Sequence, residues 1–214
     1  MICDLKTKNP MMNDEKQLLI RFMENSDIDA VEEFYNSVVD MKYAHASYAR
    51  LNTPNSTALL LVEKTEGKEK IVGLSTSLRF WHDRFSIKRE AYLTTFAIDQ
   101  KYRNRGLGSF FLNLTIYILS HHYSCVKIMC DIPKYDFDTF EFFKKRGFNG
   151  QRICKDFYGL KNGKKENSVF CMKKNDNILE KPQIEIPIEI SPDIKYLIDN
   201  VQTFGFFARI FAKP

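Results

Sequence analysis

The sequence feature that most constrains the fold is a glycine-containing turn between an apolar strand and an apolar helix. Residues 90–99 (EAYLTTFAID) are typical of a strand, and residues 109–120 indicate a helix rich in Phe, Leu and Ile. The turn between them contains the motif RNRGLG at residues 103–108. Two glycines let the backbone approach a ligand, and the free N–H groups of a first helical turn attract anions. The alternative is a glycine-capped surface turn with solvated arginines.

The charge pattern favours a small anionic ligand over a nucleic acid. Lys101, Arg103 and Arg105 add positive potential to the turn, but the net charge of +5 is only mildly basic and no concentrated basic stripe is present. Neither common phosphate motif occurs, because GxxxxGK[ST] is absent and Phe111 stands where GxGxxG needs its third glycine. A membrane surface is the other partner that a mildly basic chain suits.

The order of the expected elements indicates a three-layer α/β sandwich on a mixed sheet. The expected order is strand, helix, a hairpin of two strands, strand, helix, strand, helix and two final strands. The expected strands are residues 17–24, 58–63, 71–80, 90–99, 124–132, 148–160 and 168–174, and the expected helices are 27–38, 109–120 and 137–146. Residues 39–56 have no clean period and are expected to form a long loop or a short helix.

Length and composition fit one domain with an extension at each end. The 214 residues are 44% hydrophobic and 28% charged, which allows a sizeable core. Residues 1–16 are polar, and we expect them to form a flexible arm. We expect residues 17–174 to form the domain and residues 175–214 a C-terminal extension. No apolar run reaches the ~18–20 residues of a membrane-spanning helix, and no secretory signal is evident. We therefore expect a cytoplasmic location, with the nucleus and the membrane periphery as alternatives.

The C-terminal extension predicts an edge strand followed by an amphipathic helix. Residues 183–190 (QIEIPIEI) alternate strictly, and Pro187 excludes a central strand. From residue 191 onward, apolar residues recur at helical spacing on one face. Residues 191–214 could contact a membrane surface, or dock on the chain's own sheet or on a partner. Asp193 and Asp199 dilute the basic face and favour docking.

Two sequence blocks together resemble the GNAT superfamily of N-acetyltransferases. The form [QR]-x-x-G-x-[GA] after an apolar strand resembles the acetyl-coenzyme A (acetyl-CoA) loop of that family, and residues 127–148, with KIMCDIP and DTFEFFKKRGF, resemble its second block. The resemblance spans residues 18–174 and implies an α/β/α fold on a mixed, mostly antiparallel sheet. It identifies 17–174 as the N-acetyltransferase domain.

The resemblance also implies where acetyl-CoA binds. The diphosphate would lie on the amides of the turn, and the pantetheine arm would pair with the main chain of the preceding strand. The implied cofactor-binding residues are Phe96, Ala97, Ile98, Arg103, Asn104, Arg105, Gly106, Leu107, Gly108, Ser109, Asp136 and Phe143. Asp136 stands at the position of the family's asparagine. Phe143 stands at that of its tyrosine, and it has no hydroxyl to protonate a leaving thiolate.

Within the superfamily the chain is most similar to catalytic subunits of protein N-terminal acetyltransferases of the NatE and NatF types. This likeness implies that Tyr43 and Tyr158 bind the acceptor and that Tyr92 and Asp131 are catalytic. Asp131 stands where those enzymes have a histidine. It could take the amine proton directly, or Tyr92 with Asp131 could do so through water. The plain alternatives are a core or rim aromatic for Tyr92 and a helix-capping or solvent-facing carboxylate for Asp131.

Three functions follow in order of preference. The first is acetyl transfer to a protein N-terminal α-amine, and the second is transfer to a lysine or a small amine such as a polyamine or amino sugar. The third is a non-catalytic subunit that binds coenzyme A, motivated by Phe143 and the missing histidine. No metal and no covalent cysteine intermediate are expected. Cys130 adjoins Asp131 but alternates to the opposite face of its strand, as a small core residue would.

Overall fold

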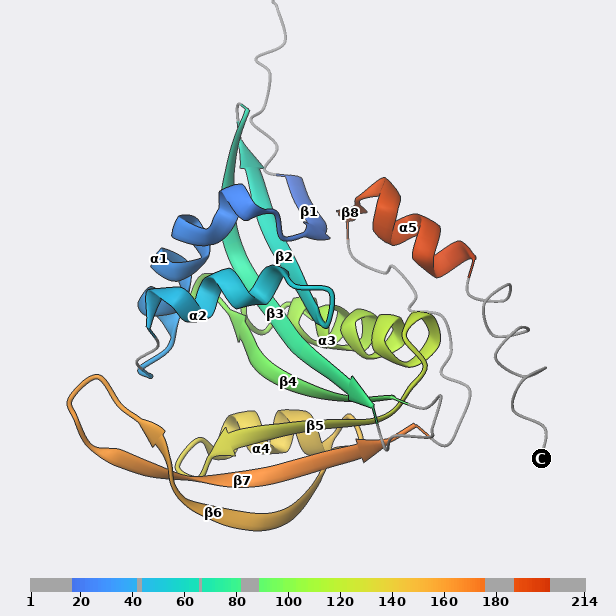
Figure 1. The fold of residues 1–214 in the computed structure, drawn as a ribbon. Helices are drawn as coiled ribbons and strands as arrows, with labels where there is room; N and C mark the ends of the chain where they lie inside the picture. The colour runs from blue at the N-terminus through green and yellow to red at the C-terminus, as the bar shows by residue number, and fades with distance from the viewer. Residues whose placement is uncertain (1–16, 42–43, 66, 82–88, 176–186, 201–214) are drawn as a thin grey trace, which may run out of the picture.

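The computed structural model describes residues 17–41, 44–65, 67–81, 89–175 and 187–200, and its described strands form one mixed sheet (Figure 1). The strand order is β6-β7-β5-β4-β3-β2-β1-β8. The pairs β4–β5 and β1–β8 are parallel and the others are antiparallel. The strands are β1 (Gln17–Phe22), β2 (Ser56–Thr65), β3 (Lys68–Trp81), β4 (Arg89–Ile98), β5 (Cys125–Pro133), β6 (Asn149–Gly159), β7 (Lys165–Lys174) and β8 (Ile188–Ile190).

Helices cover both faces of the sheet, which confirms the three-layer arrangement (Figure 1). The helices are α1 (Ile28–Val38), α2 (His45–Ala49), α3 (Leu107–Tyr117), α4 (Phe137–Lys144) and α5 (Pro192–Asp199), with 3-10 turns η1 (Asn25–Asp27), η2 (Arg50–Asn52) and η3 (Gln100–Tyr102) and a π-helical turn η4 (Ile118–His122). Leu60 and Val62 of β2 pack toward α1, whereas Leu59 and Leu61 pack toward α3. The alternation along one strand therefore places α1 and α2 on one face and α3 on the other.

Helix α3 packs against other elements on most of its surface. Phe111 and Leu114 pack with β1, β2 and α5, while Leu112 and Ile116 pack with β4, β5 and α4. Complete burial of one such side chain stabilises the fold by about 1.5–3 kcal/mol. The N-terminus of α3, which follows the glycine turn, is therefore held at a defined place beside the sheet.

Strands β4 and β5 separate partway along their length. Their parallel pairing runs from Arg89 to Tyr92 on β4 and from Cys125 to Met129 on β5. Beyond Tyr92, the main chain of β4 pairs only with β3, and a register shift there leaves Thr94 as an extra residue. The β5-facing edge of β4 is thus without strand partners over residues 93–98.

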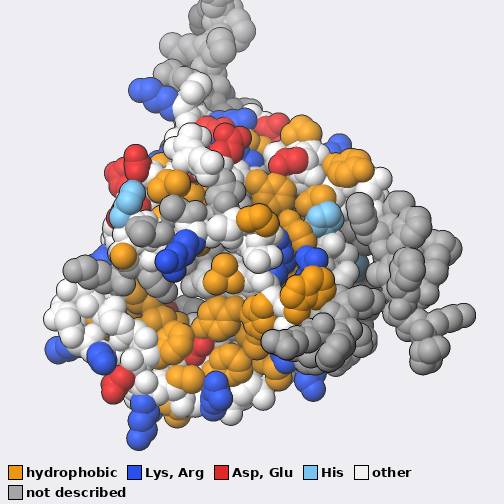
Figure 2. All heavy atoms as spheres, in the orientation of Figure 1, with side chains coloured by type: hydrophobic (Ala, Val, Ile, Leu, Met, Phe, Trp, Pro, Cys, Tyr) orange, Lys and Arg blue, Asp and Glu red, His pale blue; other side chains and the backbone are white. Residues whose placement is uncertain are grey.

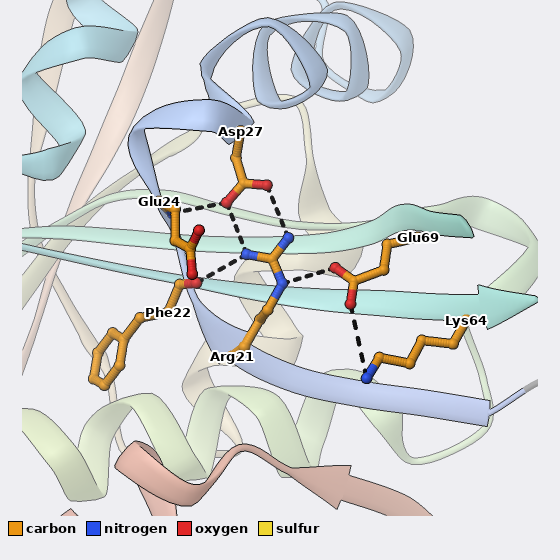
Figure 3. A network of polar contacts seen from close by, with 6 residues as sticks. All are labelled: Arg21, Phe22, Glu24, Asp27, Lys64 and Glu69. Carbon is orange, nitrogen blue, oxygen red and sulfur yellow. Dashed lines mark hydrogen bonds and ion pairs between the residues drawn. The ribbon is translucent and has the colours of Figure 1, made fainter. Parts of the chain in front are cut away.

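A polar network joins the first strand to the first helix (Figure 3). Arg21 of β1 makes two hydrogen bonds to Asp27, at 2.7 and 2.8 Å, and a third at 2.8 Å to Glu69 of β3. Asp27 also accepts the backbone N–H of Glu24 at 2.7 Å. This network fixes the start of α1 against the β1 edge.

The C-terminal extension docks on the chain's own body. Strand β8 begins directly after Pro187 and pairs with β1 at the edge of the sheet, so the predicted edge strand is present over residues 188–190, while residues 183–186 lie outside the described part of the chain. Ile194 and Ile198 of α5 are buried in the cluster that contains Phe111. Helix α5 is therefore docked on the chain's own sheet, and residues 201–214 lie outside the described part of the chain. Among the described residues, no helix is long and apolar enough to cross a membrane.

Candidate active site

The turn before α3 leaves backbone donors free at the helix N-terminus. Gly106 is the N-cap in the left-handed region, with φ 79°, and no side chain caps the helix. The first intrahelical donor is the N–H of Phe110, which reaches the Gly106 carbonyl at 3.0 Å. The N–H groups of residues 107–109 therefore have no intrahelical acceptor and are available to an anion.

The three basic residues of the turn have different roles. Arg103 donates its Nε–H to the carbonyl of Ile98 at 2.9 Å, which ties the turn to the end of β4. Arg105 is exposed and lies 6.0 Å from the ring centroid of Tyr102. Asn104 is also in the left-handed region, with φ 59°. Lys101 is exposed and donates its backbone N–H to Asp99 at 2.9 Å.

The edge of β4 leads directly to this turn. The ring of Phe96 packs against Phe111, Phe142 and Phe143, with centroids 5.8–5.9 Å apart, and Ala97 and Ile98 are buried. Their side chains therefore serve the core and leave only main-chain groups toward the gap, as expected. A Cβ on Gly108 would lie 3.6 Å from the ring of Phe142, which is an ordinary packing distance, so α4 packs closely against the start of α3 here. Open edge amides followed by helix-terminal amides fit a pantetheine arm and a diphosphate.

Two residues assigned to cofactor binding have evident packing or capping roles. Phe143 is buried, and its ring lies 5.1 Å from that of Phe148. Asp136 is the N-cap of α4 and accepts the backbone N–H and the hydroxyl of Thr139, at 3.0 and 2.7 Å. Their contact with a cofactor stays a prediction.

Asp131 lies where three hydroxyl groups from neighbouring strands meet. The Tyr92 hydroxyl of β4 donates to Asp131 Oδ2 at 2.5 Å, and the Ser168 hydroxyl of β7 donates to Oδ1. The Tyr158 hydroxyl of β6 donates to the Asp131 carbonyl at 2.5 Å. Cys130 is buried on the opposite face of β5, as predicted, so the carboxylate points to the face that α1 and α2 cover. The structure thus brings Tyr92, Asp131 and Tyr158 together.

The phenol of Tyr92 keeps its proton at neutral pH. Burial, and then the hydrogen bond to Asp131, raise the pKa of Tyr92 well above its usual value. Tyr92 is therefore a donor to the carboxylate, and the carboxylate is the group with lone pairs to offer.

Ser168 was not identified from the sequence. It is fully buried, and β7 places it two residues from Phe170, the cross-strand partner of Asp131. Side chains two residues apart share a face of a strand, so only the β5–β7 register could have revealed the contact.

The end of the last hairpin, formed by β6 and β7, reaches the helix layer on the α1 side of the sheet. Strand β6 bulges between Cys154 and Tyr158 and has Asp156 at φ 51°. At the hairpin's end, Leu160 forms a bridge with Met41, and Lys161 Nζ donates to the carbonyls of Asn36 and Val39 at 2.6 and 2.7 Å. The hairpin is thus joined to the C-terminal end of α1. Tyr43, the other predicted acceptor-binding residue, lies outside the described residues.

The surface beside Tyr92 is apolar. Leu78, its cross-strand partner on β3, is 41% exposed, and Phe157 on the β6 bulge is 46% exposed. Figure 2 shows hydrophobic side chains gathered over the β4 and β5 region of this face. Within the described part of the chain, no group of His, Cys, Asp and Glu is placed to hold a metal ion.

The two faces of the separated strands offer different chemistry. One side has free amides at the β4 edge and at the N-terminus of α3, and the other has a carboxylate and phenols beside an apolar surface. The class of protein with this division is the coenzyme A-dependent acyltransferases. Residues 24–148, more than half of the chain, match the Acetyltransferase (GNAT) family, and the chain belongs to that family. It is an acetyltransferase that depends on acetyl-CoA.

Solved structures share the fold at low sequence identity. NAA60 of Arabidopsis thaliana in complex with acetyl-CoA is 16% identical, with a TM-score of 0.67 over 75% of this chain and 100% of that one. Naa50 of the same plant, bound to the bisubstrate analogue CoA-Ac-MVNAL, is 17% identical, with a TM-score of 0.61 over 74% and 99%. The ribosomal-protein-S18-alanine N-acetyltransferase of Escherichia coli is 15% identical, with a TM-score of 0.59 over 76% and 99%. No curated protein sequence matches the chain.

Proposed function

We propose that the protein transfers an acetyl group from acetyl-CoA to a protein N-terminal α-amine, and that residues 17–174 are its catalytic domain. The observation that carries the proposal is the Tyr92–Asp131 pair, which lies between an apolar surface and a hairpin joined to α1. A slender acceptor with apolar first residues suits this place. Structural neighbours solved with bisubstrate analogues, one of which includes the residues MVNAL, support the same choice.

On the donor side, the chain's own residues bind and orient acetyl-CoA. The amides of residues 107–109 hold the diphosphate, and main-chain groups of residues 96–98 hold the pantetheine arm beside the gap between β4 and β5. When bound, acetyl-CoA supplies the electrophilic thioester carbonyl. Main-chain N–H groups of β4 near the bulge at Thr94 are the candidate donors for the oxyanion.

On the acceptor side, Asp131 receives the amine proton. An α-amine has a pKa of about 8, so near neutral pH it is mostly protonated and must lose one proton to become a nucleophile. The Oδ atoms of Asp131 each accept one hydroxyl and retain a further acceptor site, which can take a proton directly or through water. Tyr92 holds the carboxylate in place.

The leaving group does not require a tyrosine at position 143. A thiol with a pKa of about 8.5 is a good leaving group as its thiolate. Phe143 therefore removes one proton donor from the family pattern without blocking the reaction.

A thiol-release assay tests the proposal. Free N-terminal peptides, acetyl-capped lysine peptides and polyamines are each offered as acceptors, and Asp131→Asn and Tyr92→Phe are compared with the wild type. We expect free N-termini to react fastest, with the rate about 10²–10⁴-fold lower in Asp131→Asn, in line with the loss of a general base, and reduced less in Tyr92→Phe. Full activity in both variants would remove the catalytic assignment.

A second candidate acceptor is a small cationic amine. Tyr135, just beyond β5, has its pKa raised by burial and by the nearby carboxylates of Asp136, Asp40 and Glu166. Carboxylates close to the hairpin end would attract a cationic amine. Faster turnover of polyamines than of peptides in the same assay would select this function.

A further inference from the structure

Arg146 lies against the N-terminus of α3, although it belongs to a distant part of the sequence. Its guanidinium carbon is 3.6 Å from the ring centroid of Phe142, and Nη1 donates to the Phe142 carbonyl at 2.6 Å. Nη2 donates to the hydroxyl of Ser109 in the first turn of α3. The end of α4 thus brings a cation to the same helical turn that has free amides.

This cation has no anionic partner among the residues that the structure describes. Burial lowers the pKa of Arg146, and its Nε is buried without a hydrogen-bond acceptor. Arg21, in contrast, is paired with two carboxylates. A partly buried cation beside the positive end of a helix dipole is electrostatically unfavourable unless an anion binds there.

The arginines of the turn itself have other recorded contacts. Arg103 donates its Nε–H to the Ile98 carbonyl, and Arg105 is exposed, 6.0 Å from the ring centroid of Tyr102. Arg146 is the arginine that contacts Ser109 at the helix N-terminus.

We propose that Arg146 binds the diphosphate of coenzyme A, together with the amides of residues 107–109. Ser109 connects the free amides with Arg146, because it lies in the first turn of α3 and its hydroxyl accepts a hydrogen bond from the guanidinium. The group that these amides would hold is the diphosphate, so the guanidinium is placed to neutralise that charge rather than the ribose 3′-phosphate. The proposal concerns the donor side and is independent of which amine is the acceptor.

Calorimetric titrations with three probes test it: acetyl-CoA, dephospho-coenzyme A and S-acetylpantetheine, which has no phosphate. In Arg146→Gln we expect about 10–100-fold weaker binding of both nucleotides, as for the loss of a charge-assisted contact, with unchanged affinity for S-acetylpantetheine. Lys145→Gln is the matched control, since Lys145 is exposed and its substitution removes the same charge from the neighbouring position. This control should bind all three probes as the wild type does.

Equal nucleotide affinity in Arg146→Gln and the wild type would overturn the proposal. A loss for acetyl-CoA without a loss for dephospho-coenzyme A would also overturn it, because it would assign the arginine to the 3′-phosphate. If Arg146→Gln does not fold, Arg146→Lys replaces it. Lysine keeps the charge but not the planar fork, so nucleotide affinity should fall about 3–10-fold with S-acetylpantetheine again unaffected.

Discussion

Asp131 is held by hydroxyl groups from β4, β6 and β7, so its position depends on the pairing of four neighbouring strands. Tyr92 and Ser168 donate to its two carboxylate oxygens, and Tyr158 donates to its main-chain carbonyl. The neutral hydroxyl donors therefore fix the orientation of the carboxylate, which stands where the resembling enzymes have a histidine.

Ser168 provides a test of this orientation. We expect Ser168→Ala to lower kcat about 5–20-fold while the KM for acetyl-CoA stays constant, because the hydroxyl holds the proposed base Asp131 and not the proposed cofactor site. Ser168→Cys, with a weaker donor, should be intermediate. Steady-state kinetics on both variants measure the effect.

Ser75→Ala is the control for the loss of a buried hydroxyl. Ser75 is buried like Ser168, but its hydroxyl pairs with Thr115 of α3 at 2.9 Å, away from Asp131. Its substitution should lower stability without changing kcat. A similar kcat loss in both alanine variants would contradict a specific role for Ser168.

At the level of elements, the beginning of α1 depends on one ionised carboxylate. The hydrogen bonds from Arg21, above all, lower the pKa of Asp27, so the carboxylate is more stable in the folded than in the unfolded chain. A lowered folded-state pKa contributes stability that is fully present above the unfolded value of about 3.9 and is lost as pH falls through the folded value.

Asp27→Asn should therefore lower the free energy of unfolding by about 1–2 kcal/mol at pH 7. The difference from the wild type should shrink as the pH falls below about 4, because protonation removes the same charge. Urea unfolding at several pH values measures this. Asp29→Asn is the control, since Asp29 is exposed in the first turn of the same helix. A difference that is constant from pH 7 to pH 3 would contradict the role of the ion pair.

Elements with long, regular patterns were predicted well. The α1 helix and the β2–β3 hairpin agree with their expected ranges to within a few residues, and Gly147 ends the α4 region with φ 85°, as a helix terminator does. The π-helical turn η4 was not predicted. This turn continues α3, and the Tyr123 N–H donates to the Ile118 carbonyl five residues earlier, at 3.2 Å. A π-helical turn has this wider hydrogen-bond spacing, which the apolar periodicity of the sequence does not reveal.

For the whole molecule, the C-terminal extension completes the far edge of the sheet. Strands β4, β3, β2 and β1 separate β8 from β5, so α5 lies far along the sheet from Asp131. Ile194 of α5 is fully buried, and Tyr196 on the same helix is 60% exposed. The extension is therefore expected to affect stability and not catalysis.

Ile194→Ala should lower the free energy of unfolding by about 2–5 kcal/mol, as for other buried isoleucines, while kcat for the acceptor stays constant. Tyr196→Ala on the exposed side should change stability by no more than about 0.5 kcal/mol. Thermal unfolding and the thiol-release assay measure the two effects. Unchanged stability in Ile194→Ala would show that α5 is not docked as described.

The sequence by itself determined the features that depend on local chemistry. The order of strands and helices indicated the layers, and Gly106 and Gly108 indicated a turn with free amides before a helix. Only the tertiary structure decided that Ser168 meets Asp131 and that Arg146 meets Ser109. The physical reason is that local spacing governs backbone conformation, whereas contacts between distant segments depend on strand register and on which apolar surfaces pack together.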